Sequence, residues 1–347
     1  MIKVLVLQNG VSHYRLPFYN MLSKYVDLTV MYTGTSVDGE RKFKEIECKS
    51  VRFFGFYFHP GLLSAIKDYD VVISMFDLRW ISFVLAGLFA KKGVFWSHCY
   101  GKSSFINKVR IFFLKRVDAI LAYYSATFDR LKEDGVDPAK MFATENTVYI
   151  EKPQNNDPEF RKNFIYVGRY QERKGLLELL YAFESILDKI DSESNLYFVG
   201  PGFENFYKEY VEDKPVESRV KFTGAIHSEE VLRKLYLSSI AYVSPKHVGL
   251  GVLHSFAYGT PVITLNLETH APEFTNCENN FNSIILDDIG QLSSAMLALS
   301  KDLPKLKYLS ENAFSLYTES RTMHLMTLRT VDLIRNLTQK SSSEISQ

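Results

Sequence analysis

Short apolar runs alternate with longer amphipathic stretches through the first 150 residues of the chain. The apolar runs are continuous, which is typical of parallel strands buried on both faces. They predict strands at Lys3–Leu7, Val26–Tyr32, Val71–Met75, Gly93–Trp96 and Ala119–Ala122. The stretches between them predict helices at Phe18–Lys24, Arg79–Ala90, Phe105–Lys115 and Ala126–Asp134. This alternation indicates an α/β domain, which we place at residues 1–150.

A polar segment at residues 151–162, with two prolines, is typical of a linker. The alternation then restarts and predicts a second domain at residues 163–320. Its predicted strands are Phe164–Val167, Leu196–Val199, Val220–Thr223, Ile240–Ser244, Val262–Leu265 and Ser283–Leu286, and its predicted helices are Leu176–Ile190, Glu204–Val211, Glu229–Leu237, Gly251–Tyr258 and Ile289–Leu299. We expect a last helix at 321–338 to pack back on the first domain, and a frayed Ser-rich tail at 339–347. The predicted architecture is two Rossmann-like domains with parallel sheets facing each other across a cleft.

Composition excludes several classes of protein. Hydrophobic residues make up 46% and charged residues 23% of the 347 residues, so the chain has enough apolar material to fold. The 41 Lys+Arg against 40 Asp+Glu argue against a dedicated nucleic-acid binder. Three cysteines without a CxxC support neither a disulfide framework nor a zinc site, and fit a reducing cytoplasm. The longest uncharged apolar run, Trp80–Ala90, is shorter than the about 20 residues that a transmembrane helix needs.

The first candidate site follows the strand at Phe164–Val167. Gly168 lets the chain turn, Arg169 and Lys174 lie on the turn, and a helix begins after Gly175. Two cations beside a helix N-terminus, at the end of a strand, are suited to bind a diphosphate group. The alternative is an ordinary strand–turn–helix with solvated charges.

The second candidate site is the glycine-rich turn between the strand at Ile240–Ser244 and the next helix. It contains His247, Gly249, Leu250 and Gly251, and a C-capping Gly259 ends the helix. Backbone N–H groups near Gly249 to Gly251 are suited to a sugar hydroxyl or phosphate. The alternative is that the glycines serve loop geometry alone.

Taken together, these motifs resemble glycosyltransferase family 4 (group 1), retaining enzymes of the GT-B fold. The resemblance covers about 120 residues and rests on Gly168-Arg169-Tyr170 with Lys174-Gly175, Val199-Gly200-Pro201-Gly202-Phe203-Glu204, Val220-Lys221-Phe222-Thr223-Gly224, Gly259-Thr260-Pro261-Val262-Ile263 and Thr269-His270-Ala271-Pro272-Glu273-Phe274. It implies a donor site at Gly168, Arg169, Lys174, His247, Gly249 and Leu250 for a UDP- or GDP-sugar. It also implies that Arg169 and Lys174 neutralise the donor diphosphate without a metal or other cofactor.

The chain departs from this family at two positions. The family has two glutamates eight residues apart, one near the donor sugar and one near the ribose, where this chain has Lys246 and His254. One interpretation is a subfamily in which His254 binds the ribose and the His247–Gly251 backbone serves the sugar. The other is a degraded site. Glu273 is a candidate for the missing carboxylate, although an acid in the first turn of a helix also interacts with the helix dipole.

In the first half, the resemblance points to bacterial surface-polysaccharide enzymes through the segment Tyr14-Arg15-Leu16-Pro17-Phe18. It implies a catalytic role for His98, at a strand end near the donor's anomeric carbon, and a donor contact at Gly10, where many members have two glycines. The expected acceptor-binding residues are His13, Tyr14, Arg15, Asp77 and Arg79. The alternatives are a helix-start charge for Arg15 and a structural role for His98.

Charge is distributed unevenly between the halves. Residues 1–150 hold 20 Lys+Arg and 14 Asp+Glu, a net charge of +6, and the remainder carries −5. The basic and apolar segment 102–116 is suited to an anionic membrane surface, or alternatively to a core-facing helix with a solvated edge. We therefore expect a cytoplasmic enzyme, peripheral on the inner face of the cytoplasmic membrane, whose acceptor is a saccharide or lipid-linked saccharide.

The function predicted by the sequence is a retaining hexosyltransferase of bacterial polysaccharide biosynthesis, making O-antigen, capsule or exopolysaccharide. Two alternatives stay open: a non-catalytic subunit that binds a sugar nucleotide, and a GT-B sugar-nucleotide 2-epimerase. A dehydrogenase is disfavoured because no Gly-x-Gly-x-x-Gly follows the first strand.

Overall fold

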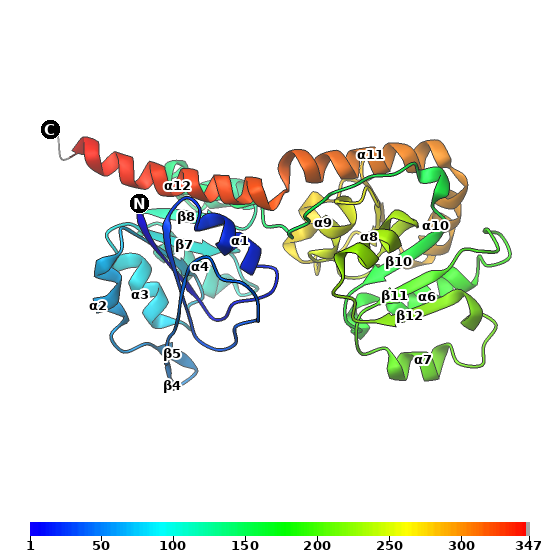
Figure 1. Cartoon of the computed structure of the whole chain (residues 1–347), viewed down its shortest axis with the longest axis horizontal. Coiled ribbons are helices and arrows are strands. Elements are labelled where there is room, and N and C mark those ends of the chain that lie inside the picture. Colours follow the sequence, from blue (N-terminus) through cyan, green and yellow to red (C-terminus); the bar gives the residue numbers. More distant parts are fainter. Residues whose placement is uncertain (345–347) are drawn as a thin grey trace. The chain divides into compact units, whose positions relative to one another are not determined.

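The computed structural model describes residues 1–344 and divides into two compact units (Figure 1). Unit 1 consists of Met1–Tyr149 together with the chain from Met323 onward, and unit 2 is Ile150–Thr322. Each unit is an α/β domain built on one parallel sheet, as the continuous apolar runs predicted.

The sheet of unit 1 has seven parallel strands in the order β3-β2-β1-β6-β7-β8-β9. The predicted strands appear as β1 (Lys3–Gln8), β2 (Asp27–Tyr32), β6 (Val71–Met75), β7 (Gly93–Ser97) and β8 (Ala119–Ala122). The edge strands β3 (Lys44–Glu47) and β9 (Met141–Ala143) were not predicted, because β3 is polar and partly exposed and β9 is short. A separate antiparallel hairpin joins β4 (Val51–Phe53) to β5 (Phe56–Phe58).

Helices cover both faces of this sheet. On one face α1 (Leu16–Leu22) packs with α12 (Met323–Glu344), whose Met326 and Ile334 share a core with Phe18 and Trp96. The other face carries α2 (Leu62–Ala65), α3 (Ile81–Phe89), α4 (Ser104–Leu114) and α5 (Phe128–Glu133). Because α12 continues to Glu344, most of the stretch expected as a tail is helical. Residues 345–347 of that stretch lie outside the described residues.

Unit 2 has a six-stranded parallel sheet in the order β12-β11-β10-β13-β14-β15. The strands are β10 (Asn163–Val167), β11 (Leu196–Val199), β12 (Val220–Gly224), β13 (Ser239–Val243), β14 (Val262–Leu265) and β15 (Ser283–Leu286). The helices are α6 (Leu176–Glu184), α7 (Glu204–Tyr210), α8 (Glu229–Leu237), α9 (Gly251–Phe256), α10 (Leu292–Lys301) and α11 (Leu303–Ser320). Only α11 lacks a counterpart among the predicted helices.

The segment predicted as a linker, residues 151–162, is packed onto unit 2. The Gln154 N–H donates to the carbonyl oxygen of Ala257 at 3.0 Å. The buried Arg161 guanidinium donates to the carbonyl oxygen of Gly259 at 2.7 Å and to Asn155 Oδ1 at 2.8 Å. These bonds attach the segment to the end of α9, so it does not act as a free tether.

Both sheets reverse their winding direction once. In unit 1 the chain proceeds outward from β1 through β2 to β3, and then from β6 through β7 and β8 to β9. In unit 2 the same reversal lies between β10 and β13. Open α/β sheets bind ligands at the carboxyl ends of the strands beside such a reversal. Ligand-binding residues are therefore expected directly after β1, β6, β10 and β13.

No helix within residues 1–344 combines the length and the apolar character needed to cross a membrane.

Candidate functional site

The turn after β10 begins with close backbone packing. Gly168 has a φ of +152°, and a Cβ there would lie 2.8 Å from Tyr166 Oη. Gly200, which follows β11, approaches so closely that its Cβ would lie 2.1 Å from the carbonyl oxygen of Gly168. Both glycines are thus required by packing. They fix the backbone from which the exposed Arg169 projects.

Lys174 connects this turn to the turn after β13. Its Nζ donates to the carbonyl oxygen of His247 at 2.9 Å, and the Lys246 N–H donates to the carbonyl oxygen of Lys174 at 3.1 Å. Burial and the neighbouring Arg173 lower the pKa of Lys174 to about 8, while the charge of Glu273 opposes this shift. A desolvated ammonium group with two remaining protons, beside the N-terminus of α6, is suited to a phosphate group.

The loop after β13 is held by a chain of hydrogen bonds through two histidines. His247 Nδ1 donates to the carbonyl oxygen of Thr269 at 2.7 Å, and the Val248 N–H donates to His270 Nδ1 at 3.1 Å. His270 Nε2 donates in turn to the carbonyl oxygen of Leu265 at 2.6 Å. Burial lowers the pKa of both histidines, so both rings are neutral at physiological pH. His247 therefore shapes the loop and adds no positive charge.

Three other predicted donor residues occupy the same region. Leu250 directly precedes α9, and Gly249 stands before it with no neighbouring atom within 4 Å of an added Cβ. Neither a positive φ nor a close contact requires a glycine at position 249. Glu273 is 6% exposed on the turn Pro272–Asn276, near enough to influence Lys174 electrostatically.

Each of the two residues that replace the family's glutamates is paired with a glutamate from another element. Lys246 forms an ion pair with Glu178 of α6. His254 Nε2 lies 3.0 Å from Glu229 Oε1 at the start of α8, and Tyr258 donates its hydroxyl proton to the same oxygen. Burial would raise the pKa of Glu229, but the hydrogen bonds from His254 and Tyr258 bring it below its usual value. Two carboxylates thus lie beside the two basic residues.

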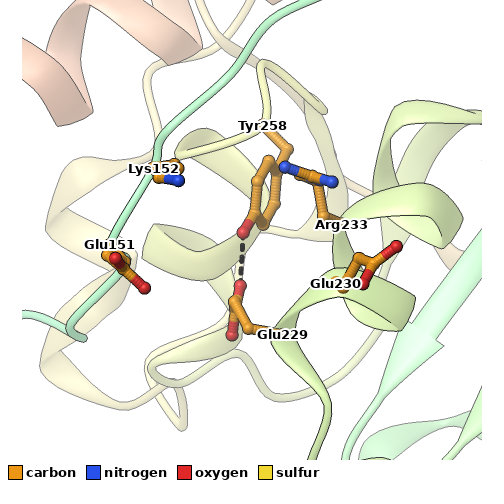
Figure 2. Close-up of a pocket in the computed structure, with 6 residues that line it drawn as sticks. All are labelled: Glu151, Lys152, Glu229, Glu230, Arg233 and Tyr258. Carbon is orange, nitrogen blue, oxygen red and sulfur yellow. Dashed lines mark hydrogen bonds between the residues drawn. The ribbon is translucent and has the colours of Figure 1, made fainter.

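Figure 2 shows the surroundings of Glu229 and Tyr258. They line a cavity of about 310 Å³ together with Glu151, Lys152, Glu230 and Arg233. Within the described part of the chain, no hydrogen bond or ion pair joins His254 to Lys174 or His247. The sequence analysis missed Glu178 and Glu229, because their partners are 68 and 25 residues away in the chain.

At the carboxyl edge of the sheet of unit 1, Arg15 lies among aromatic rings. It is 7% exposed, and its guanidinium carbon lies 4.3 Å from the Trp96 ring centroid, with Tyr14 and Tyr123 also within reach. Its side chain makes no hydrogen bond or ion pair with any residue that the structure describes. An arginine that is buried against rings and forms no ion pair within the described residues is suited to an anionic ligand.

His98 follows β7 and adjoins the Arg15 cluster. Its ring packs edge-on against Tyr123, with centroids 4.1 Å apart. Burial, together with the positive charges of Arg15 and Arg110, lowers the pKa of His98 to about 4. The ring is therefore neutral at physiological pH and offers a hydrogen bond without a positive charge. Arg110, on α4, is a neighbour that the sequence analysis did not identify.

The remaining predicted residues of unit 1 differ in their surroundings. Arg79 pairs with Asp77, with 2.6 Å between Arg79 Nη2 and Asp77 Oδ2. Burial would raise the pKa of Asp77, but the Arg79 hydrogen bonds and the charge of Arg110 lower it. Gly10 is required by packing, since a Cβ there would lie 2.8 Å from the carbonyl oxygen of Thr35. His13 and Tyr14 are exposed.

Comparison with known proteins identifies the fold. The sequence model of the family "Glycosyl transferases group 1" matches residues 149–315. A glycosyltransferase from Rickettsia africae has 18% identity and a TM-score of 0.74, covering 97% of this chain and 98% of its own. Anabaena HepE, solved with UDP and glucose, has 15% identity and a TM-score of 0.68, covering 96% and 99%. WaaB, a lipopolysaccharide outer core galactosyltransferase, has 14% identity and a TM-score of 0.69, covering 96% and 99%. These similarities show the GT-B fold.

The same fold also includes a putative UDP-N-acetylglucosamine 2-epimerase from Listeria monocytogenes. It has 13% identity and a TM-score of 0.68, covering 98% of both chains. A comparison with curated protein sequences gives no match.

Proposed function

We propose that this chain, whose residues 149–315 match the family "Glycosyl transferases group 1", is a retaining hexosyltransferase of family 4 that uses a UDP- or GDP-sugar. The observation that carries the proposal is the pair of cations at the carboxyl end of β10. Arg169 is exposed there, and Lys174 is half-buried and hydrogen-bonded to the turn after β13. This is the edge of the sheet at which a nucleotide diphosphate is expected.

The chemistry asks the protein to stabilise a departing nucleoside diphosphate. The bond between the anomeric carbon and the diphosphate oxygen breaks, a bond to the acceptor oxygen forms on the same face of the sugar, and the proton of the acceptor hydroxyl passes to the departing diphosphate. Arg169 and Lys174 are placed to neutralise the leaving group, the role that a divalent metal fills in other transferases. His98, with its neutral ring, would orient the sugar or the acceptor hydroxyl through a hydrogen bond.

We assign the acceptor to unit 1. Arg15, which forms no ion pair with a described carboxylate, would hold an anionic group of a lipid-linked saccharide, with His13 and Tyr14 exposed beside it. The neighbour WaaB is described as a lipopolysaccharide enzyme, which supports an acceptor of bacterial polysaccharide biosynthesis.

The surface of α4 supports a peripheral membrane location. One face of the helix is buried through Asn107, Ile111 and Leu114. Phe105, Lys108 and Phe112 form the opposite, exposed face, and Lys115 and Arg116 follow directly. Unit 1 as a whole has 23 Lys+Arg and 16 Asp+Glu, a net charge of +7, against −6 for unit 2. Cations interleaved with exposed aromatics suit an anionic bilayer surface.

The test of the proposed function is donor turnover and donor binding by the purified chain. We expect it to bind UDP or GDP and to transfer or slowly hydrolyse the matching sugar donor. Arg169→Ala and Lys174→Ala should each weaken nucleotide binding about ten- to hundredfold, the loss expected for one charge-assisted hydrogen bond. Arg173→Ala, which removes the same charge from the same turn, is the control and should change binding much less.

Three results would overturn this assignment. Unchanged affinity in both variants would remove the diphosphate from this turn. Nucleotide binding without transfer or hydrolysis would favour the non-catalytic subunit. Conversion of UDP-N-acetylglucosamine to its C2 epimer without an acceptor would favour the epimerase, an activity named for one neighbour of the same fold.

A further inference from the structure

The β4–β5 hairpin presents an apolar face that is largely exposed to solvent. Its cross-strand pairs are Val51 with Phe58 and Phe53 with Phe56, and these four side chains lie on one face of the ribbon. All four are exposed, Phe53 by 62%. At the tip, Phe54 is 86% exposed and packs edge-on against Phe53 with ring centroids 4.5 Å apart. In Figure 1 the hairpin projects from the sheet of unit 1.

The turn of this hairpin holds a phenylalanine in a strained conformation. Phe54 has a φ of +47° and Gly55 a φ of +83°, the pattern of a two-residue type I′ turn. Asn, Asp or Gly is preferred at the first of these positions, because a side chain with a bulky Cβ substituent disfavours the left-handed region. The fold thus tolerates both strain and exposure to keep an aromatic ring at the tip. Neither folding nor solubility explains that choice of residue.

The base of the hairpin is attached to the rest of unit 1 by a backbone hydrogen bond and by stacked rings. The Tyr57 N–H donates to the carbonyl oxygen of Arg79 at 2.7 Å, and the Tyr57 ring stacks on Trp80 with centroids 4.3 Å apart. His59, just beyond β5, stacks on Phe83 and contacts Thr33 Oγ1 through Nε2 at 2.9 Å. Of the residues that the hairpin contacts, Thr33 comes after the carboxyl end of β2, and Arg79 and Trp80 come after that of β6. They place the hairpin at the same edge of the sheet as Asp77.

The charge around the hairpin indicates what it contacts. Lys49 and Arg52 are the only charged residues from position 48 to 66, so the charges within the hairpin and next to it in the sequence are positive. The ribbon has eight residues, whereas a stable protein interface uses about 20–30 residues on each side. Aromatic side chains with flanking cations match the interfacial region of an anionic bilayer.

We propose that the β4–β5 hairpin inserts Phe53 and Phe54 into an anionic lipid bilayer and anchors the acceptor-binding edge of unit 1 at the membrane surface. The proposal rests on the peripheral location proposed above and adds a contact independent of α4. The hairpin comes after the carboxyl end of β3, and α4 comes after the carboxyl end of β7. The candidate acceptor residues lie at this same edge of the sheet. A lipid-linked acceptor would then meet these residues at the level of the headgroups.

The test is co-sedimentation of the full chain with vesicles of phosphatidylcholine and phosphatidylglycerol. Phe54→Asn should lower the apparent affinity about tenfold, because one buried aromatic ring is lost. The same change relieves the turn, so the melting temperature should rise by about 2 °C. Loss of binding in a better-folded variant separates a lipid contact from a structural role. The matched control is Phe89→Asn at the end of α3, where another largely exposed ring (70% against 86% for Phe54) lies at the opposite edge of the sheet.

A second measurement uses Phe54→Trp as a fluorescent probe. The two native tryptophans, Trp80 and Trp96, are both buried and should respond little to lipid. We expect a blue shift on adding anionic vesicles and quenching by brominated lipid. Unchanged vesicle affinity in Phe54→Asn, or no shift in Phe54→Trp, would overturn the proposal. So would a Phe54-dependent dimer in sedimentation velocity without an effect on lipid binding.

Vesicle binding and nucleotide binding are measured separately, so failure of the membrane proposal can be told apart from failure of the proposed function. Lys174→Ala should lose nucleotide affinity and keep vesicle binding, whereas Phe54→Asn should keep nucleotide affinity and lose vesicle binding. A chain that binds vesicles through the hairpin but transfers no sugar would contradict only the enzymatic proposal.

Discussion

The Nζ of Lys174 donates a hydrogen bond to the carbonyl oxygen of His247 across 2.9 Å, joining the turns that follow β10 and β13. These two strands are neighbours in the sheet although they are more than 70 residues apart in the chain. The bond holds a half-buried ammonium group at the point where the sheet reverses its winding direction. Its protonation state therefore matters for any anion that binds there.

Lys174 should make nucleotide affinity depend on pH. Its pKa is lowered to about 8 in the free protein, and a bound diphosphate would raise it again. Binding then takes up a proton above pH 8, so affinity should fall as the pH rises. We expect the Kd for UDP or GDP to increase about tenfold from pH 7 to pH 9, measured by calorimetry.

The control for this pH dependence is Lys174→Arg, which keeps a positive charge throughout the range. Its Kd should stay nearly constant between pH 7 and pH 9. An equally steep pH dependence in Lys174→Arg would show that another group is responsible.

His254 and Glu229 should contribute to the stability of unit 2 as a coupled pair. His254→Glu, which restores the residue type of the resembled family, would place a second carboxylate about 3 Å from Glu229 Oε1. We expect unit 2 to lose about 1–2 kcal/mol of unfolding free energy at pH 8 through like-charge repulsion. The loss should shrink as the pH falls toward 5, because one carboxyl then takes up a proton. Urea denaturation at both pH values measures this.

The double variant His254→Glu with Glu229→Gln should recover most of that stability. Independent, additive losses in the double-mutant cycle would mean that the two residues are not coupled.

Arg15 should influence the titration of His98. Both burial and the Arg15 charge lower the pKa of His98, and burial is the larger cause. Arg15→Gln should therefore raise that pKa toward, but not up to, the usual 6.5, as followed by NMR of the ring protons. It should also destabilise unit 1 by about 1–2 kcal/mol through loss of the cation–π contacts. Lys24→Gln, an exposed charge of the same unit, should change neither. A fixed His98 pKa in Arg15→Gln would contradict this arrangement.

The fold was predictable where apolar runs are continuous. The central strands of both sheets are buried on both faces, so almost every residue in them is apolar, and β6, β8, β11, β14 and β15 have the predicted ends. Helix α11 was not among the predicted helices, although its sequence has an N-cap at Asp302 and apolar residues at helical spacing, Leu306, Leu309, Ala313 and Tyr317, which are buried in the structure. The β4–β5 hairpin was not predicted because its apolar side chains face solvent, whereas strand prediction expects apolar side chains to be buried.

The candidate site was predictable only where its residues lie close together in the sequence. Gly168, Arg169 and Lys174 lie on one turn, so their proximity follows from sequence spacing. The partners of Lys246, His254 and Arg15 are set by sheet order and helix packing, which bring distant segments together. No local pattern contains that information. This is why the carboxylates of Glu178 and Glu229 emerged only from the structure.

A substitution at Gly249 should change donor-sugar binding without changing the stability of unit 2. An added Cβ would meet no atom within 4 Å, so Gly249→Ala should leave the unfolding free energy nearly unchanged. At Gly251 a Cβ would lie 2.6 Å from Tyr242 Oη, so Gly251→Ala should destabilise unit 2 by about 1–3 kcal/mol. If the donor approaches the backbone at Gly249, Gly249→Ala should weaken donor-sugar binding about tenfold while its melting curve overlays that of the wild type. Wild-type affinity in Gly249→Ala would place the donor sugar elsewhere on unit 2, since neither packing nor backbone conformation would mask the effect.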